Sequence, residues 1–212
     1  MQPLLVVFAI YSSRARFVIL DILGQDCAAA LATDRYASYA RIDVEHRQIC
    51  WADLLRDLNL SGQRHGLPGQ IGRRLLGLGL VMVRWRERGL RAGARLEGLQ
   101  RSTQATLLRG SQQLHCTRTA NTCNNILKLW PALWPFTFNP LVAPANSAAE
   151  QDLRSIVLRR KIFGPSRSRR GDQFRAHVSS VHGSGLRQGR DLWGFAHAAV
   201  QAFIANSAPP RA

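Results

Sequence analysis

Residues 30–39 read Ala-Leu-Ala-Thr-Asp-Arg-Tyr-Ala-Ser-Tyr, a short apolar run that ends at the carboxylate of Asp34. The run predicts a strand over residues 28–33. Asp34 would then lie at the carboxyl end of that strand, where α/β sheets present side chains to ligands. The segments before and after this run indicate the kind of sheet to which the strand belongs.

Patterns of strand and helix alternate on both sides of Asp34. The further elements expected in this part of the chain are strands over 4–10 and 47–51 and helices over 13–23, 36–39 and 52–60. The helix over 13–23 should end at Gly24, because glycine favours the backbone conformation that closes a helix. This alternation predicts an α/β sheet.

The character of the sequence changes after residue 60. Gly62, Gly66, Pro68 and Gly69 are typical of a linker, and the leucine- and arginine-rich pattern beyond them predicts helices over 71–88, 103–114 and 119–129, with a composition break at 89–98. Later helices are expected over 147–161, 174–186 and 191–205, with a basic loop over 164–171. The expected divisions are 1–60, a helical insertion over 61–143, 144–205, and a frayed tail over 206–212.

The composition favours a polyanionic partner. The 212 residues include 29 basic and 13 acidic side chains, for a net charge of +16, and all but two of the basic residues are arginine. Arginine binds phosphate oxygens bidentately, which favours nucleic acid over a small acidic ligand. The alternative is a coding bias toward arginine, since arginines occur along the whole chain. The candidate DNA-binding residues are Arg154, Arg159, Arg160, Lys161, Arg167, Arg169 and Arg170.

Other classes of protein fit the sequence poorly. The four cysteines form no close pairs of zinc ligands, so we expect reduced, mostly buried thiols. The apolar stretch over 75–83 is too short to cross a bilayer. Residues 1–10 lack the basic start of a secretory signal. We therefore expect a cytoplasmic protein without membrane contact, associated with the nucleoid if it binds DNA.

Glu150 is the second carboxylate of interest, and each of the two has a simple structural interpretation. Ser147-Ala-Ala-Glu150 is a capping-box pattern, in which the glutamate satisfies a backbone amide at a helix start. Asp34 after a strand is equally typical of a turn or a helix cap. Neither residue by itself indicates a catalytic site.

Several motifs occur together in one order. Thr33-Asp34-Arg-Tyr-Ala-Ser-Tyr is followed by Gln48-Ile-Cys-Trp-Ala-Asp53, then by Asn146-Ser-Ala-Ala-Glu150, Val157-Leu-Arg-Arg-Lys-Ile, Gly171-Asp-Gln-Phe and Arg187-Gln-Gly-Arg. In this order the chain resembles the insertion-sequence sixty-six family of DDE transposases along nearly its whole length.

The resemblance implies a ribonuclease-H-like catalytic core, interrupted by a mostly helical insertion, and a function in DNA transposition. Asp34 would be the second and Glu150 the third carboxylate of a triad that holds Mg²⁺ for strand cleavage and transfer. The implied partner is double-stranded DNA at the ends of the element, bound by a homo-oligomer.

The chain departs from the family at three places. The first aspartate of the family lies upstream of residues 4–10, and neither Asp21 nor Asp26 is placed to replace it, so we expect an N-terminally truncated, incomplete core. Asp53 stands where the family has histidine, and Gln151 where it has arginine. The open alternatives are an inactive transposase, a non-catalytic DNA-binding remnant and a decayed gene fragment.

Overall fold

The computed structural model describes residues 5–13, 15–24, 27, 29–89 and 94–208, and these form two compact units. Residues 15–146 form one, here called the central unit, and residues 1–14 with 147–212 form the other, called the terminal unit. The expected domain boundaries at 60, 143 and 205 stay predictions. The fold is mostly helical with a small parallel sheet, which is α/β overall.

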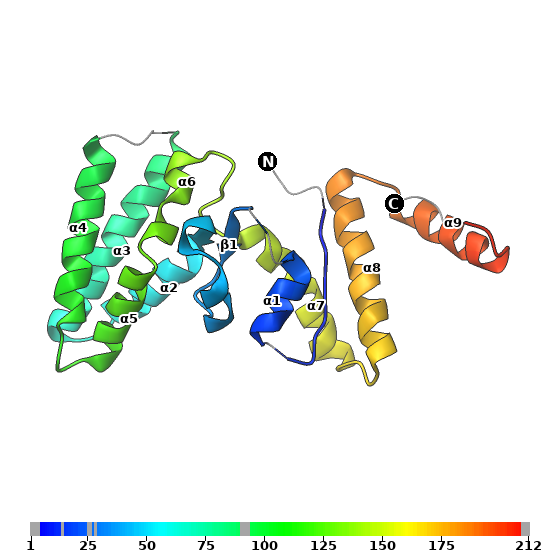
Figure 1. Ribbon diagram of the computed structural model, residues 1–212, viewed down its shortest axis with the longest axis horizontal. Helices are drawn as coiled ribbons and strands as arrows, with labels where there is room; N and C mark the ends of the chain where they lie inside the picture. Colours follow the sequence, from blue (N-terminus) through cyan, green and yellow to red (C-terminus); the bar gives the residue numbers. More distant parts are fainter. Residues whose placement is uncertain (1–4, 14, 25–26, 28, 90–93, 209–212) are drawn as a thin grey trace. The chain divides into compact units, whose positions relative to one another are not determined.

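The central unit contains both strands of the described chain. Its elements are α1 Arg16–Leu23, β1 Leu31–Thr33, the 3₁₀ helices η1 Ala37–Arg41 and η2 Val44–His46, β2 Arg47–Ile49, α2 Trp51–Gly62, α3 Gly66–Glu87, α4 Ala94–Ser111, α5 Thr117–Lys128, η3 Pro131–Leu133 and α6 Pro135–Phe138. The two strands pair in parallel, with Leu31 opposite Arg47 and Thr33 opposite Ile49. Helices α2 to α5 pack in sequence, each against the next (Figure 1).

Most of the elements predicted around Asp34 are confirmed. The strand expected over 28–33 forms at Leu31–Thr33, although Ala28 lies outside the described residues, as does Asp26. The strand expected over 47–51 is shorter, because α2 already begins at Trp51. The first helix ends at Gly24, whose positive φ of 77° and N–H bond to Leu20 close it.

The hydrophobic core lies in the central unit. Helix α2 contributes Trp51, Leu54 and Leu58, three and four residues apart, so one stripe of the helix is buried. The Trp51 ring lies 6.2 Å from Trp134 and 6.3 Å from Phe136, which brings the segment after α5 onto the same core. Two of the four free cysteines, Cys50 and Cys123, are buried there, and burial raises the pKa of the Cys123 thiol to about 11.

The segment Arg47–Trp51 is buried throughout and ties the sheet to the helices. Gln48 accepts a hydrogen bond from the Phe136 N–H at 2.9 Å and donates one to the Ile49 carbonyl at 2.8 Å. The Trp51 indole donates to the Leu133 carbonyl at 2.9 Å, and its backbone N–H donates to Pro144 at 2.8 Å. Buried polar groups need such partners, so this segment fixes the chain around it.

The predicted linker around residues 62–69 is wrong. Gly62 ends α2, and Gly66, Pro68 and Gly69 belong to the first turns of α3. A proline is tolerated there because the first N–H groups of a helix have no partner within the helix. Two glycines of α3 allow close backbone contact instead, since a Cβ on Gly69 would lie 1.8 Å from the Arg64 carbonyl oxygen and a Cβ on Gly72 would lie 2.5 Å from the Gly62 nitrogen.

The terminal unit contains α7 Ser147–Phe163, α8 Arg169–Gln188 and α9 Leu192–Ile204. These confirm the three helices predicted for this part of the chain, and the basic loop between α7 and α8 ends at Ser168 rather than at 171. The predicted tail over 206–212 lies partly outside the described residues, as does the composition break over 89–98. Among the described helices, none is long and apolar enough to cross a membrane.

The strand expected over 4–10 does not form in the described residues 5–10, and Leu4 lies outside them. These residues run along α8 instead (Figure 1). The N–H of Val6 donates to the Ser184 hydroxyl at 2.9 Å, and the N–H of Phe8 donates to the Ser180 hydroxyl at 2.8 Å. Helix side chains thus satisfy the backbone that a neighbouring strand would otherwise satisfy.

Because α2 and α3 lie in close contact, two glycine-to-alanine substitutions on α3 should change the free energy of unfolding in opposite directions. Gly72→Ala should lower the free energy of unfolding by about 1–3 kcal/mol, because its Cβ would press on the backbone of Gly62. Gly77→Ala, whose added Cβ would meet no neighbouring element within 4 Å, should raise it by up to about 1 kcal/mol. Urea unfolding measures both; equal effects would contradict the close approach of the two helices.

Candidate functional site

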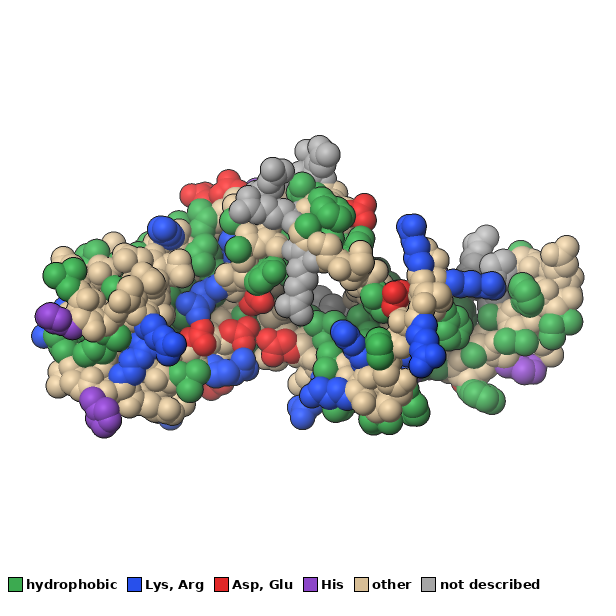
Figure 2. Space-filling view, turned by 90° about the horizontal axis from the view of Figure 1, so that it is seen from below, with side chains coloured by type: hydrophobic (Ala, Val, Ile, Leu, Met, Phe, Trp, Pro, Cys, Tyr) green, Lys and Arg blue, Asp and Glu red, His purple; other side chains and the backbone are tan. Residues whose placement is uncertain are grey.

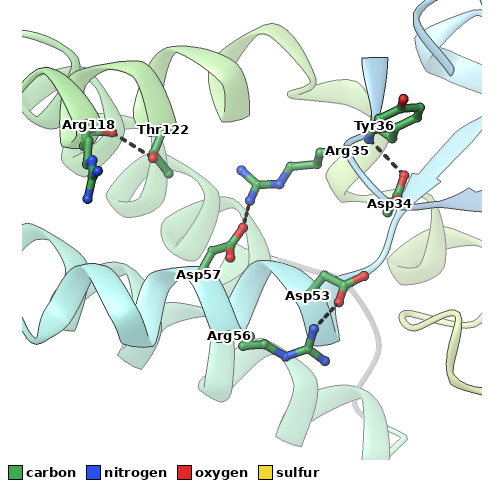
Figure 3. A network of polar contacts seen from close by, with 8 residues as sticks. All are labelled: Asp34, Arg35, Tyr36, Asp53, Arg56, Asp57, Arg118 and Thr122. Carbon is green, nitrogen blue, oxygen red and sulfur yellow. Dashed lines mark hydrogen bonds and ion pairs between the residues drawn. The ribbon is translucent and has the colours of Figure 1, made fainter. Parts of the chain in front are cut away.

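Asp34 follows β1 directly, as the sequence predicts. Its side chain is exposed, and its Oδ1 accepts a hydrogen bond from the Tyr36 N–H at 2.9 Å (Figure 3). This contact is the side-chain turn that aspartate favours after a strand. The preceding residue, Thr33, accepts the Cys50 N–H through its carbonyl at 2.9 Å, which continues the pairing of the two strands. Asp34 therefore stands at the carboxyl edge of a parallel sheet.

A buried arginine fixes the backbone at Asp34. Arg47 is 3% exposed and donates through Nε and Nη2 to the Thr33 hydroxyl at 3.3 and 3.2 Å. It also donates to the carbonyls of Asp34 at 3.3 Å and Tyr39 at 3.2 Å. Burial lowers the pKa of Arg47, and the charge of Asp34 opposes that shift. Arg47 was identified in the sequence only as part of a strand.

Arg35 connects the sheet edge to α2. Figure 3 shows its guanidinium extended toward Asp57 of α2, with which it forms an ion pair. Burial lowers the pKa of Arg35, while the charges of Asp53 and Asp34 raise it. The three aspartates therefore share one positive neighbour at this edge.

Asp53 replaces the histidine that the resemblance implies, and its surroundings show what it does instead. It lies in the first turn of α2, where the helix dipole favours a negative charge. Its Oδ1 pairs with Arg56 at 2.8 Å. The adjacent Cys50 is buried, which raises the pKa of its thiol, and its Sγ accepts the Asn146 N–H at 3.4 Å. An ionised carboxylate cannot donate a hydrogen bond as histidine can.

Glu150 lies in the terminal unit, in the first turn of α7, and is exposed. The start of this helix is held by Arg187 of α8, whose Nη2 donates to Asp152 at 2.7 Å and to the Ala148 carbonyl at 3.4 Å. Arg187 was part of a sequence motif without an assigned role. Its contacts position the turn that carries Glu150.

Asp34 and Glu150 thus belong to different compact units. Each is an exposed carboxylate at the start or end of a regular element, as predicted. Their joint role as metal ligands stays a prediction.

The seven predicted DNA-binding residues are all exposed. Four lie on α7, Arg167 lies in the following loop, and Arg169 and Arg170 begin α8. On the face drawn in Figure 2, blue side chains project from the part of the terminal unit that contains α7 and α8. An exposed arrangement of this kind suits contacts with phosphate groups.

The basic loop before α8 has a defined conformation. The Ser168 hydroxyl caps α8 by accepting the Gly171 N–H at 3.1 Å, and the Ser166 hydroxyl donates to Asp172. Arg175 reaches back to the Gly164 carbonyl at 3.2 Å. The loop therefore presents Arg167 from a fixed backbone, which lowers the entropy cost of binding.

The comparison with protein families agrees with the motifs. The model of the Transposase IS66 family matches residues 2–173, which is more than half of the chain. The chain therefore belongs to the IS66 family of transposases. The matched range contains Asp34, Glu150 and the seven basic residues. No curated protein and no solved structure gives a significant match to the chain.

The contacts of Arg47 predict a large loss of stability for Arg47→Gln. This change removes its bonds to Thr33 and to the carbonyls of Asp34 and Tyr39, and should cost about 2–4 kcal/mol of unfolding free energy. Arg56→Gln, which breaks a largely exposed ion pair, should cost less than about 1 kcal/mol. Denaturant unfolding followed by tryptophan fluorescence compares them; equal losses of stability would refute the role of Arg47.

Proposed function

We propose that this transposase chain binds double-stranded DNA at element ends through the basic segment formed by α7, the following loop and the start of α8. The family membership together with the exposure of all seven basic residues carries this proposal. Cations on one contiguous segment neutralise successive phosphates and release counterions, which gives affinity without sequence recognition.

The start of α8 strengthens the case for an anion. Arg169 and Arg170 are the first two residues of this 20-residue helix, where the positive end of the helix dipole disfavours cations. A phosphate at this position would interact favourably with both arginines, whereas the Gly171 N–H of the first turn already donates to Ser168. The Asp172 carboxylate in the first turn offsets part of this positive charge, and a DNA phosphate would offset more of it.

Asp34 and Glu150 are the proposed ligands of Mg²⁺. Exposed carboxylate oxygens are the donors that this ion prefers, so both residues fit it chemically. When bound, the metal would activate the attacking oxygen and stabilise the leaving oxygen of a phosphodiester.

We expect binding without cleavage from this chain. Asp53 and Gln151 stand where the resemblance implies a histidine and an arginine; an ionised carboxylate cannot donate a hydrogen bond as histidine can, and glutamine lacks the charge of arginine. The Asp53 carboxylate is already paired with Arg56. Binding through the basic segment depends on none of these positions.

The salt dependence of DNA binding tests the proposal. The affinity for a 30-base-pair duplex, measured by fluorescence anisotropy, should fall steeply between 50 and 300 mM salt. In the triple variant Arg159→Gln/Arg160→Gln/Arg169→Gln, the slope of log K against log salt should decrease by about 0.9 for each phosphate that is no longer neutralised. The exposed Arg56→Gln change serves as a control and should leave the slope unaltered.

Two results would contradict the proposal. Affinity that is constant across this range of salt would exclude phosphate binding as its source, and an unchanged slope in the triple variant would place the phosphate-binding residues elsewhere. The bound duplex should also remain intact with Mg²⁺ present. Cleavage that disappears in both Asp34→Asn and Glu150→Gln would contradict the expectation of binding without cleavage and show that both carboxylates are required for it.

A further inference from the structure

A groove between α3 and α4 in the central unit carries a second concentration of positive charge. Its volume is about 370 Å³, and its floor contains the buried side chains of Ile71 and Thr106. Arg74 of α3 and Arg109 of α4 are both exposed and both line it. The expected DNA-binding residues include neither of them.

The polar groups of the groove come from aligned positions on the two helices. Gln70 and Arg74 are four residues apart on α3, so they share one face of that helix. On α4, Ser102, Thr106 and Arg109 are separated by four and three residues and share another face. The two faces form opposite walls, and each wall carries one guanidinium.

A cross-helix hydrogen bond positions one of the two arginines. Arg74 donates through Nη2 to the Ser102 hydroxyl at 3.2 Å. The Thr106 hydroxyl donates to the Ser102 carbonyl at 2.7 Å, so both hydroxyl groups on this face of α4 are hydrogen-bonded. The geometry keeps Arg74 over the groove, where its remaining N–H groups can meet an oxyanion.

The lining of the groove contains two positive charges and no acidic residue. The acidic residue of the first turn of α4, Glu97, is not part of the lining and lies 3.9 Å from Arg101. Two cations that face one space without a carboxylate repel each other, and an anion between them would offset that repulsion. A solvated basic surface is the simpler alternative, and the two make different predictions for binding.

We infer that this groove binds the phosphodiester backbone of DNA. The forked guanidinium groups of Arg74 and Arg109 match phosphate oxygens, and Gln70 adds a neutral donor. Leu67 and Ile71 give the groove an apolar part that suits the carbon atoms of deoxyribose rather than a free phosphate ion. The inference rests on the proposed function, because it assigns the helical part of the transposase a second region of contact with the same DNA.

A charge-matched pair of double variants tests the groove. Arg74→Gln/Arg109→Gln should weaken binding of the 30-base-pair duplex by about 10-fold and lower the salt slope by about 1.8, because two phosphates are no longer neutralised. Arg95→Gln/Arg118→Gln removes two exposed arginines of the same unit that do not line the groove, and should change the affinity less than about 2-fold. Circular dichroism melts of both confirm that they fold.

The outcomes separate this inference from the proposed function. If the unaltered chain does not bind DNA, both fail. If it binds DNA and the two double variants behave alike, the groove assignment alone fails. A third arm adds pyrophosphate at constant ionic strength: pyrophosphate that binds the unaltered chain but not Arg74→Gln/Arg109→Gln, and that leaves the duplex bound, would identify a site for free phosphates and overturn the assignment to DNA.

Discussion

The buried segment from Arg47 to Trp51 is the constraint on which the central unit depends. It forms the second strand, begins α2, and places the Gln48 amide and the Trp51 indole inside the core. Leaving such groups unpaired would cost several kcal/mol, which the hydrogen bonds to Phe136, Leu133 and Pro144 avoid. Sheet and helices are therefore fixed by one short stretch of hydrogen bonds.

Two features fix the geometry of the candidate site: this segment and the ion pair between Arg187 and Asp152. Arg47 donates a hydrogen bond to the backbone carbonyl of Asp34 and so fixes the backbone position from which the exposed carboxylate extends. In the terminal unit, Arg187 and Asp152 join α8 to the start of α7, which carries Glu150. In both places a largely buried arginine binds the backbone or a neighbouring side chain and not the carboxylate of interest. The backbone position of each carboxylate is therefore fixed, while its oxygens stay exposed.

The sequence predicted what depends on local pattern. The strand before Asp34, the helix that ends at Gly24 and the helix bearing Glu150 all form where the pattern predicts them, although the apolar residues expected on the inner face of the last helix are not buried. It failed where tertiary packing decides: residues 5–10 are apolar like a strand but lie along the serines of α8, and Gly69 belongs to a helix in close backbone contact rather than to a linker. The groove of Arg74 and Arg109 was also missed, since it exists only when α3 and α4 pack together.

Chemical footprinting can show whether the arginines of the basic segment contact DNA. Phenylglyoxal modifies accessible arginines, and mass spectrometry compares each site with and without a bound duplex. We expect Arg159, Arg160, Arg167 and Arg169 to be protected in the complex, and Arg56 to be modified equally in both states. Equal modification of the four residues in free and bound protein, under conditions where the duplex is fully bound, would contradict it.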